Sequence, residues 1–392
     1  MPEPTIALII PVRDGGANFR QCLAAIAESS SRPDELIVAD DGSTDESIRW
    51  AAAAGARVLA TGKAGSGPAA ARNLAASQAN GDILFFCDAD VQIRRDTVER
   101  IRQSFAADST LDALFGSYDD EPGDSGFLSQ YKNLFHHYIH QHGAEEAATF
   151  WSGCGAIRRE LFIRHGGFSA RYTRPSIEDI ELGYALKRSG GRIRLDKFFL
   201  VKHLKRWTVG SLLHSDIVAR GIPWTQLILR EGAFLNDLNL QTHNRFSVVA
   251  VYLGVLCALA GVWIPAAWLG VPLAALTLVA LNWPLYRWFA RKRGAVFAIK
   301  TLAPHWLYYI YNSISFGIGA LLHAGDQITP HLTGLSEFNA CRIVNRPVRC
   351  ARNTKVIFTR LLMVAILLVA TFLRFHRLGA QSMWLDELLE IG

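Results

Sequence analysis

The feature that most constrains the fold is a run of five apolar residues, 83–87, that leads directly into Asp88 and Asp90. A short apolar run between a glycine and two carboxylates predicts a fully buried strand of a parallel sheet. Open α/β sheets bind ligands beyond the carboxyl ends of their strands, and residues i and i+2 of an extended chain point the same way. We therefore expect both carboxylates at one site, where Mg²⁺ or Mn²⁺ would relieve their repulsion. The alternative is a strand end followed by a solvated turn.

Strands and helices alternate through the first half of the chain. Apolar strands are expected at 6–10, at 36–39 and near Val58, and helix-periodic segments follow each of them. This alternation predicts an α/β domain with a Rossmann-like, doubly wound sheet over about residues 1–235.

Composition separates two regions of the chain. Of 392 residues, 50% are hydrophobic and only 19% are charged, and the net charge is +6. No Asp or Glu occurs in 238–325 or 338–385, where the longest apolar runs lie next to basic residues. That pattern is typical of a membrane interface and not of nucleic-acid binding, which we do not expect. The six cysteines form no Cys-x-x-Cys pair, and the N-terminus lacks a signal-peptide pattern, so we expect the first domain to be cytoplasmic.

A second acidic strand end and a glycine-rich loop fit a nucleotide. Asp40 and Asp41 could accept hydrogen bonds from a ribose hydroxyl or a base N–H, although a helix-capping turn, taken alone, explains them better. The loop at 62–67 would let backbone approach a diphosphate. It fits neither the Walker A pattern nor Gly-x-Gly-x-x-Gly after a first strand. The sequence therefore supports neither a P-loop ATPase nor a dinucleotide dehydrogenase.

Four segments, 9–11, 37–45, 67–73 and 88–90, resemble the ordered motifs of family 2 glycosyltransferases. The resemblance covers about residues 5–230 and implies a GT-A fold, a nucleotide diphosphate sugar as donor, and Mg²⁺ or Mn²⁺ held by Asp88 and Asp90. It also implies a set of donor-binding residues: Pro11, Arg13, Asp40, Asp41, Gly42, Gly67, Arg72, Asn73 and Asp88.

Further similarity to this family lies in the second half of the domain. The segment 151–159, with Gly153, resembles an acceptor-side loop whose small residues would let a sugar approach the backbone. In the pair Glu178-Asp179 the resemblance implies the catalytic base, usually the Asp. The alternative is that these acids stabilise the first turn of a helix.

The segment 203–207 resembles the Gln-x-x-Arg-Trp signature of the family, with His203 in place of the Gln. Arg206 could then contact a diphosphate and Trp207 could stack on a sugar. His203 is either a third metal ligand or a plain hydrogen-bonding histidine. Upstream, the His-rich segment 130–142 fits either a zinc site or a helix that covers the active site or lies near lipid headgroups.

The pattern of the last third of the chain indicates a membrane-associated region. Segments 246–264, 266–286 and about 295–323 are long enough to span a bilayer, which gives two or three spans within 246–323. Basic residues at 287–293 should face the cytoplasm. A basic loop, 324–355, and a fourth span within 356–373 follow. Residues 374–387 resemble the opening of GT-C membrane glycosyltransferases, which indicates a fusion or a truncated reading frame at 356–392.

Taken together, these patterns predict a multi-pass protein of the inner (plasma) membrane with a cytoplasmic catalytic domain. It would be a metal-dependent, inverting hexosyltransferase that moves a sugar to a lipid-linked or envelope polysaccharide acceptor, with Asp179 as base and Glu178 beside it. Two alternatives are a nucleotidyltransferase, which would release pyrophosphate, and a non-catalytic membrane assembly subunit with a degenerate domain.

Overall fold

The computed structural model describes residues 3–232 and 242–333, and residues up to Thr329 pack as one unit. Its N-terminal part is built on one mixed sheet with the strand order β3-β2-β1-β4-β8-β6-β9-β5, with β7 paired to β9. The strands are β1 (Ile6–Val12), β2 (Glu35–Asp40), β3 (Arg57–Ala60), β4 (Ile83–Cys87), β5 (Val91–Ile93), β6 (Ala113–Tyr118), β7 (Glu146–Ala147), β8 (Cys154–Arg158) and β9 (Ile193–His203).

The expected α/β class is confirmed, but the sheet is not the purely parallel one that the apolar strands indicated. Strand β4 pairs in parallel with β1 on one side and antiparallel with β8 on the other. Strand β6 is likewise antiparallel to β8 and parallel to β9. A continuous apolar run indicates that both faces of a strand are buried. Burial does not depend on the direction of the neighbouring strand.

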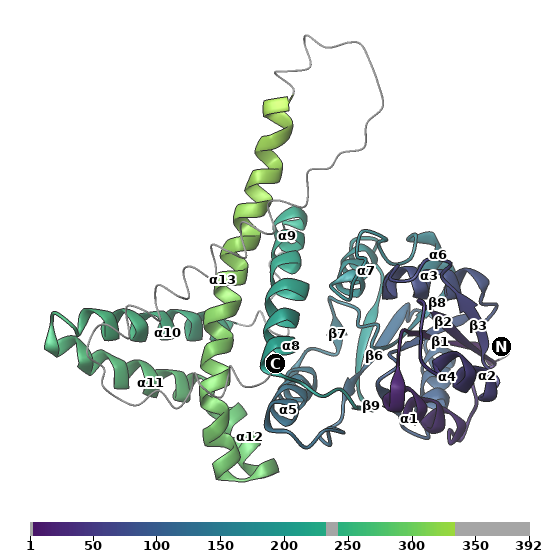
Figure 1. Cartoon of the computed structure of the whole chain (residues 1–392), viewed down its shortest axis with the longest axis horizontal. Coiled ribbons are helices and arrows are strands. Elements are labelled where there is room, and N and C mark those ends of the chain that lie inside the picture. The colour runs from purple at the N-terminus through teal and green to yellow at the C-terminus, as the bar shows by residue number, and fades with distance from the viewer. Residues whose placement is uncertain (1–2, 233–241, 334–392) are drawn as a thin grey trace. The chain divides into compact units, whose positions relative to one another are not determined.

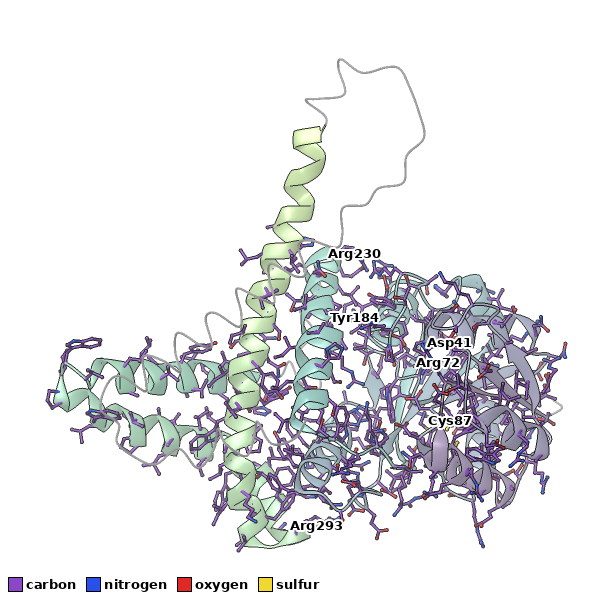
Figure 2. The ribbon with its side chains drawn as sticks, viewed as in Figure 1. Asp41, Arg72, Cys87, Tyr184, Arg230 and Arg293 are labelled. Carbon is purple, nitrogen blue, oxygen red and sulfur yellow. The ribbon has the colours of Figure 1, made fainter. Side chains whose placement is uncertain are left out.

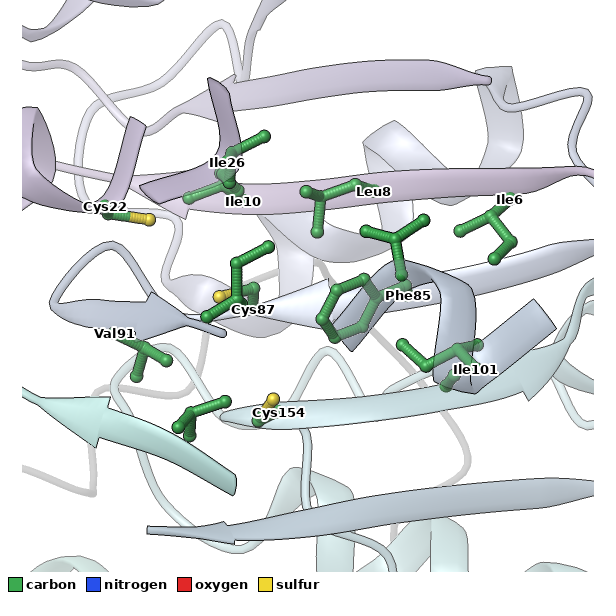
Figure 3. Packing of buried hydrophobic residues seen from close by; sticks show 14 of the residues in the cluster. Ile6, Leu8, Ile10, Cys22, Ile26, Phe85, Cys87, Val91, Ile101 and Cys154 are labelled. Atoms are coloured by element: carbon green, nitrogen blue, oxygen red, sulfur yellow. The ribbon is translucent and has the colours of Figure 1, made fainter. Parts of the chain in front are cut away.

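Helices cover both faces of this sheet. One face packs on α1 (Gly16–Ala27) and α4 (Thr97–Ala107), with Phe85 at its centre (Figure 3). The other face packs on α3 (Pro68–Gln78), α6 (Arg159–Arg164) and α7 (Glu178–Arg188). Neighbouring residues of β4 serve opposite faces because side chains alternate along a strand.

Sheet register brings distant segments to one edge. Cys87 of β4 pairs with Cys154 of β8, so the loop before β8 lies at the end of β4. Val91 of β5 pairs with His203, the last residue of β9, which places His203 close to Asp90. The ends of β4, β6 and β9 and the start of β8 therefore meet where ligands of such sheets bind.

The remaining helices of the unit include two, α2 (Ser47–Ala53) and α5 (Phe127–His142), that also contact the sheet (Figure 1). The others are α8 (Val209–Leu213), the π-helix η1 (His214–Gly221), α9 (Ile222–Glu231), α10 (Thr242–Ala260), the 3-10 helix η3 (Pro265–Leu269), α11 (Gly270–Leu281), α12 (Trp283–Arg293) and α13 (Ala295–Thr333). Helices α10 and α11 lie side by side as a hairpin.

The hairpin corresponds only in part to the expected spans. Within the described residues, one helical stretch, 243–260 of α10, is both long enough and apolar enough to cross a membrane. The second expected span does not form a single straight helix, because the chain bends by 70° between α11 and α12. Asn282 lies at this bend, where its amide donates to Ser247 and accepts from Tyr309. Helix α13 does not meet the same length and composition criterion.

The basic segment 287–293 is helical and contacts the sheet domain. It ends α12, where Lys292 binds Asp120 and Arg293 donates to Gln130 and to the Asp120 carbonyl. The predicted fourth span, most of the 324–355 loop and the GT-C-like end lie outside the described residues and stay predictions.

Gly183 lets α7 lie against the chain that precedes β8. A Cβ atom there would lie 2.4 Å from the backbone nitrogen of Phe150. We expect Gly183→Ala to lower the free energy of unfolding by about 1–3 kcal/mol, as overpacking usually does. Gly210→Ala in α8 is the matched control, because nothing lies within 4 Å of its added methyl group. Thermal unfolding of the full chain measures both, and an unchanged Tm for Gly183→Ala would contradict this packing.

Candidate active site

A buried arginine connects two of the predicted acidic motifs. Arg72 lies in the middle of α3, and its Nη2 atom is 2.6 Å from the Asp88 carboxylate at the end of β4. Its Nη1 atom is 3.2 Å from the Glu178 carboxylate at the start of α7. The guanidinium group thus holds together carboxylates that are 90 residues apart in the chain. Figure 2 labels Arg72 in the sheet domain.

Burial and neighbouring charges both shift the pKa values of these groups. Burial raises the pKa of Asp88, and its ion pair with Arg72 offsets this only in part. Burial and the charge of Asp179 likewise raise the pKa of Glu178. Burial disfavours the charge on Arg72, but the surrounding carboxylates outweigh it and raise the pKa of the guanidinium. Arg72 therefore stays cationic between acids that need its charge to remain ionised.

Asp90 and His203 lie next to each other at the same edge of the sheet. The Nε2 atom of His203 is 3.6 Å from the Asp90 carboxylate, and its Nδ1 atom is 2.7 Å from the Asn133 side-chain oxygen. If the Nδ1–H donates to Asn133, Nε2 presents a lone pair beside Asp90, which is the tautomer that a metal ligand needs. Burial opposes ionisation of Asp90. When His203 is protonated, its charge and its Nε2–H outweigh burial and lower the pKa of Asp90, and a metal ion at Nε2 would supply the positive charge instead.

These donors fit a divalent cation that is also held by a substrate. Within the described residues, no group of three His, Cys, Asp or Glu side chains is arranged to hold a metal by itself. Mg²⁺-type sites use one or two carboxylates together with substrate phosphates, and the Asp90–His203 pair meets that requirement.

The loops at the first two strand ends are ordered by their own acids. Asp41 accepts hydrogen bonds from the backbone of Ser66 and Gly67 and from the Thr61 hydroxyl. Asp40 accepts from the backbone of Gly42 and Ser43. Both carboxylates are buried and shape the loops on either side of the predicted donor site. Their contact with a nucleotide stays a prediction.

The glycines of these loops are required by close approach. Gly67 has φ +94°, and a Cβ atom there would lie 2.6 Å from the backbone of Thr173. Gly42 has φ +85°, and its added Cβ would lie 2.5 Å from Ala64. Arg13 is exposed next to the same loop. A Cβ atom added to Gly65 would lie 3.0 Å from its guanidinium group. The predicted donor loop is therefore a compact turn that only glycine allows at these positions.

Asp179 follows Glu178 in the first turn of α7 and binds the loop that precedes β8. Its Oδ2 accepts from the backbone and the hydroxyl of Ser152, at 2.9 and 3.1 Å. It lines a cavity of about 440 Å³, which Glu178 does not. The two neighbouring acids thus differ in environment, because Glu178 binds Arg72 and the backbone of Ser176.

Known proteins match this chain over the part that carries the site. Residues 7–166 match the family model described as Glycosyl transferase family 2. These residues therefore resemble a family 2 glycosyltransferase domain. A glycosyltransferase of Haemophilus influenzae, described as uncharacterized, is 34% identical over 126 residues, which are 30% of this chain and 48% of that protein. The pre-mycofactocin glycosyltransferase of Mycobacterium tuberculosis is 27% identical over 55% of this chain and 47% of its own length. The chain thus spans about half the length of these curated relatives.

A solved structure resembles more of the chain. It is the mannosyltransferase PcManGT of Pyrobaculum calidifontis, in complex with GDP-Man and Mn²⁺, with 22% identity and a TM-score of 0.50. The alignment covers 81% of this chain and 88% of that one. At this level of identity the similarity establishes the fold alone, and it supports the GT-A-like architecture of the family 2 domain.

Several predicted residues of this domain have structural partners instead of open surfaces. Asn73 exchanges two hydrogen bonds with the backbone of Phe168, so its amide positions that loop. Trp207 is 9% exposed and packs with Leu212 and Tyr311, so its ring is not free to stack on a sugar as expected. Arg206 beside it is exposed, and its contact with a diphosphate stays a prediction.

The acceptor-side glycines also serve a different purpose from the one expected. A Cβ atom on Gly153 would lie 2.7 Å from the ring of Trp151, and one on Gly155 would lie 2.3 Å from its carbonyl oxygen. The small residues therefore admit the Trp151 indole and its backbone, and not directly a sugar. Asp88 is tied to this loop, because its backbone donates to the Gly153 carbonyl.

Tyr118 was not predicted from the sequence. Its ring stacks on His203 at 4.2 Å and meets Trp151 edge-on at 4.9 Å, which links the metal side to the acceptor side. Asp119 and Asp120 follow it at the end of β6, the same signal of acids after a strand that identified the other motifs. In the His-rich helix α5, His136 and His140 pack against each other and Trp151, and the described residues offer them no third metal ligand.

Asp90 provides the direct test of the metal site. We expect Asp90→Asn to weaken Mn²⁺ binding at least tenfold while thermal unfolding stays normal, because the amide removes one anionic ligand. Binding is measured from the spin-resonance signal of free Mn²⁺, with UDP or GDP added. Asp96→Asn, an exposed acid at the start of α4, is the control. Mn²⁺ binding by Asp90→Asn as tight as wild type would place the metal elsewhere.

Proposed function

We propose that this protein is a membrane-bound, inverting glycosyltransferase. It would transfer a hexose from a nucleotide diphosphate sugar to a lipid-linked acceptor or an envelope polysaccharide. The observation that carries the proposal is the separation of the acids: Asp88 and Asp90 lie at the strand ends, while Asp179 lies beside a cavity. Donor and acceptor could then approach from different sides of Arg72.

On the donor side, Asp90 and His203 would hold the metal ion, with Asp88 next to them. A bound Mg²⁺ or Mn²⁺ would neutralise charge on the departing nucleoside diphosphate. The 62–67 loop, held in place because the N–H groups of Ser66 and Gly67 donate to Asp41, would lie against the diphosphate. Mn²⁺ in the complex of the mannosyltransferase PcManGT supports this choice of metal.

On the acceptor side, Asp179 would act as the general base. The two Ser152 hydrogen bonds fix the direction of its carboxylate and leave it on the cavity wall. From there it can remove the proton from an acceptor hydroxyl as the oxygen attacks the anomeric carbon. Glu178 would have the supporting role of keeping Arg72 in place between the two sides.

Membrane attachment is supported by the α10–α11 hairpin. From Phe246 to Tyr286 there is no acidic, basic or histidine residue, and large apolar side chains point to solvent along both helices. Their exposure would be costly in water but suits a bilayer. Because α12 binds Asp120 of the sheet domain, its basic residues lie on the same side of the membrane as the catalytic site.

The function is tested with membranes that contain the full chain. With Mn²⁺ and a panel of nucleotide sugars, we expect release of a nucleoside diphosphate with at least one donor. Asp179→Asn should lower turnover by about a hundredfold to ten-thousandfold without changing donor affinity, because the base contacts the acceptor.

Glu178→Gln is the comparison, and it should reduce turnover less than Asp179→Asn does. The base assignment fails if Glu178→Gln is the more damaged variant, or if Asp179→Asn loses donor binding in parallel with rate. Release of pyrophosphate would instead identify a nucleotidyltransferase. Metal-independent nucleotide binding without any turnover would identify a non-catalytic subunit.

Membrane attachment has its own test. Leu256 in α10 is 58% exposed, and Leu256→Arg would place a charge in the bilayer at a cost of about 2.5–3.5 kcal/mol. We expect a smaller fraction of this variant to float with phosphatidylcholine vesicles in a density gradient. Ile163→Arg is the matched control, because Ile163 is 49% exposed but lies on α6 of the sheet domain. Equal flotation of the two variants would exclude the hairpin as the anchor.

A further inference from the structure

The cavity beside Asp179 has two walls of different origin. The sheet domain contributes Phe115, Trp151 and residues of α5 and α7. The helices beyond residue 213 contribute the other wall, with Ile228 of α9, Val248 of α10 and Phe316 of α13. The cavity volume of about 440 Å³ is within the range of small-molecule sites.

Charged residues of both signs line the cavity. Three cations, Lys132, Arg220 and Arg245, and two carboxylates, Asp179 and Asp216, line it. Lys132 is occupied by Asp216, with Nζ 2.6 and 2.7 Å from the two carboxylate oxygens. Arg220 has no carboxylate within 4.0 Å among the described residues, so its charge is available to a ligand.

Two imidazoles add neutral polar groups to the same wall. Burial lowers the pKa of His136 well below its usual value and lowers the pKa of His140 to about 4. Both rings are therefore neutral at pH 7. His140 already bonds to the backbone of Gly116, whereas the Nδ1 atom of His136 is buried without a hydrogen-bond partner among the described residues. A phosphate beside them would meet hydrogen-bonding groups without a further fixed charge.

The apolar wall continues into the proposed membrane anchor. Helix α10 carries Arg245 and Val248 on the cavity and exposes Phe246, Val249 and Leu253 elsewhere on its surface. A hydrocarbon chain that lies along Val248 and Phe316 would thus run beside the helix that is expected to enter the bilayer. A soluble sugar acceptor would gain nothing from this wall.

We propose that the cavity binds the acceptor as an anionic amphiphile, with its phosphate at Arg220 and its hydrocarbon chain along α9, α10 and α13. The proposal rests on the function proposed above and makes it more specific, because it selects a phosphorylated lipid over a polysaccharide. His136 lines the same cavity as Arg220 and would orient the phosphorylated end so that an acceptor hydroxyl lies near Asp179.

Binding of a short analogue tests this without a donor sugar. Octyl phosphate, octanol and inorganic phosphate are titrated separately into the full chain in phosphatidylcholine nanodiscs, with empty nanodiscs as background. We expect octyl phosphate to bind at least tenfold more tightly than either of the others. It alone has both a phosphate for Arg220 and a hydrocarbon chain for the apolar wall. Arg220→Gln should weaken octyl phosphate about tenfold or more and leave octanol unchanged.

Two further variants separate the parts of the cavity. Val248→Trp should weaken octyl phosphate by filling the apolar wall, and Arg164→Gln, an exposed arginine of α6 outside the cavity, should change nothing. The proposal is overturned if octanol or inorganic phosphate binds as tightly as octyl phosphate, if octyl phosphate does not bind, or if Arg220→Gln binds it like wild type. None of these outcomes depends on sugar transfer, so the release of nucleoside diphosphate remains a separate test of the enzyme.

Discussion

The buried guanidinium of Arg72 is the interaction on which the rest of the site depends. It joins the end of β4 to the start of α7 through Asp88 and Glu178, two acids whose pKa values burial raises. Removing one partner of such a buried pair typically costs 3–5 kcal/mol, because the other charge is left uncompensated. The proposed donor and acceptor sides are thus held in a fixed relation by one buried side chain.

A second constraint ties the catalytic domain to its helices. Lys132 of α5, Asp216 of η1 and Tyr311 of α13 form one buried network, and α12 binds Asp120. The cavity beside Asp179 exists only because these helices supply its second wall. Catalytic domain and proposed anchor are therefore parts of one structural unit, and an acceptor held by the anchor would already lie next to the proposed base.

The family 2 match ends at residue 166, before Asp179 and His203. Within it lie the strand ends, the loop held by Asp41 and the Arg72 helix, and these account for the donor side of the site. The proposed acceptor side is carried by contacts of this chain's own fold, such as Ser152 with Asp179. Substrate choice is thus expected to depend on the region where the sequence match gives least guidance.

The sequence by itself determined the local features: alternating strands and helices, acids at the strand ends, and glycines where a turn needs positive φ. These follow from side-chain periodicity and steric limits within a few residues. Only the tertiary structure decided that β8 runs antiparallel to β4, that His203 lies beside Asp90, and that Glu178 binds Arg72 while Asp179 faces the cavity. It also decided that Trp207 is buried. Each of these depends on pairing between segments far apart in the chain, which no local pattern of residues encodes.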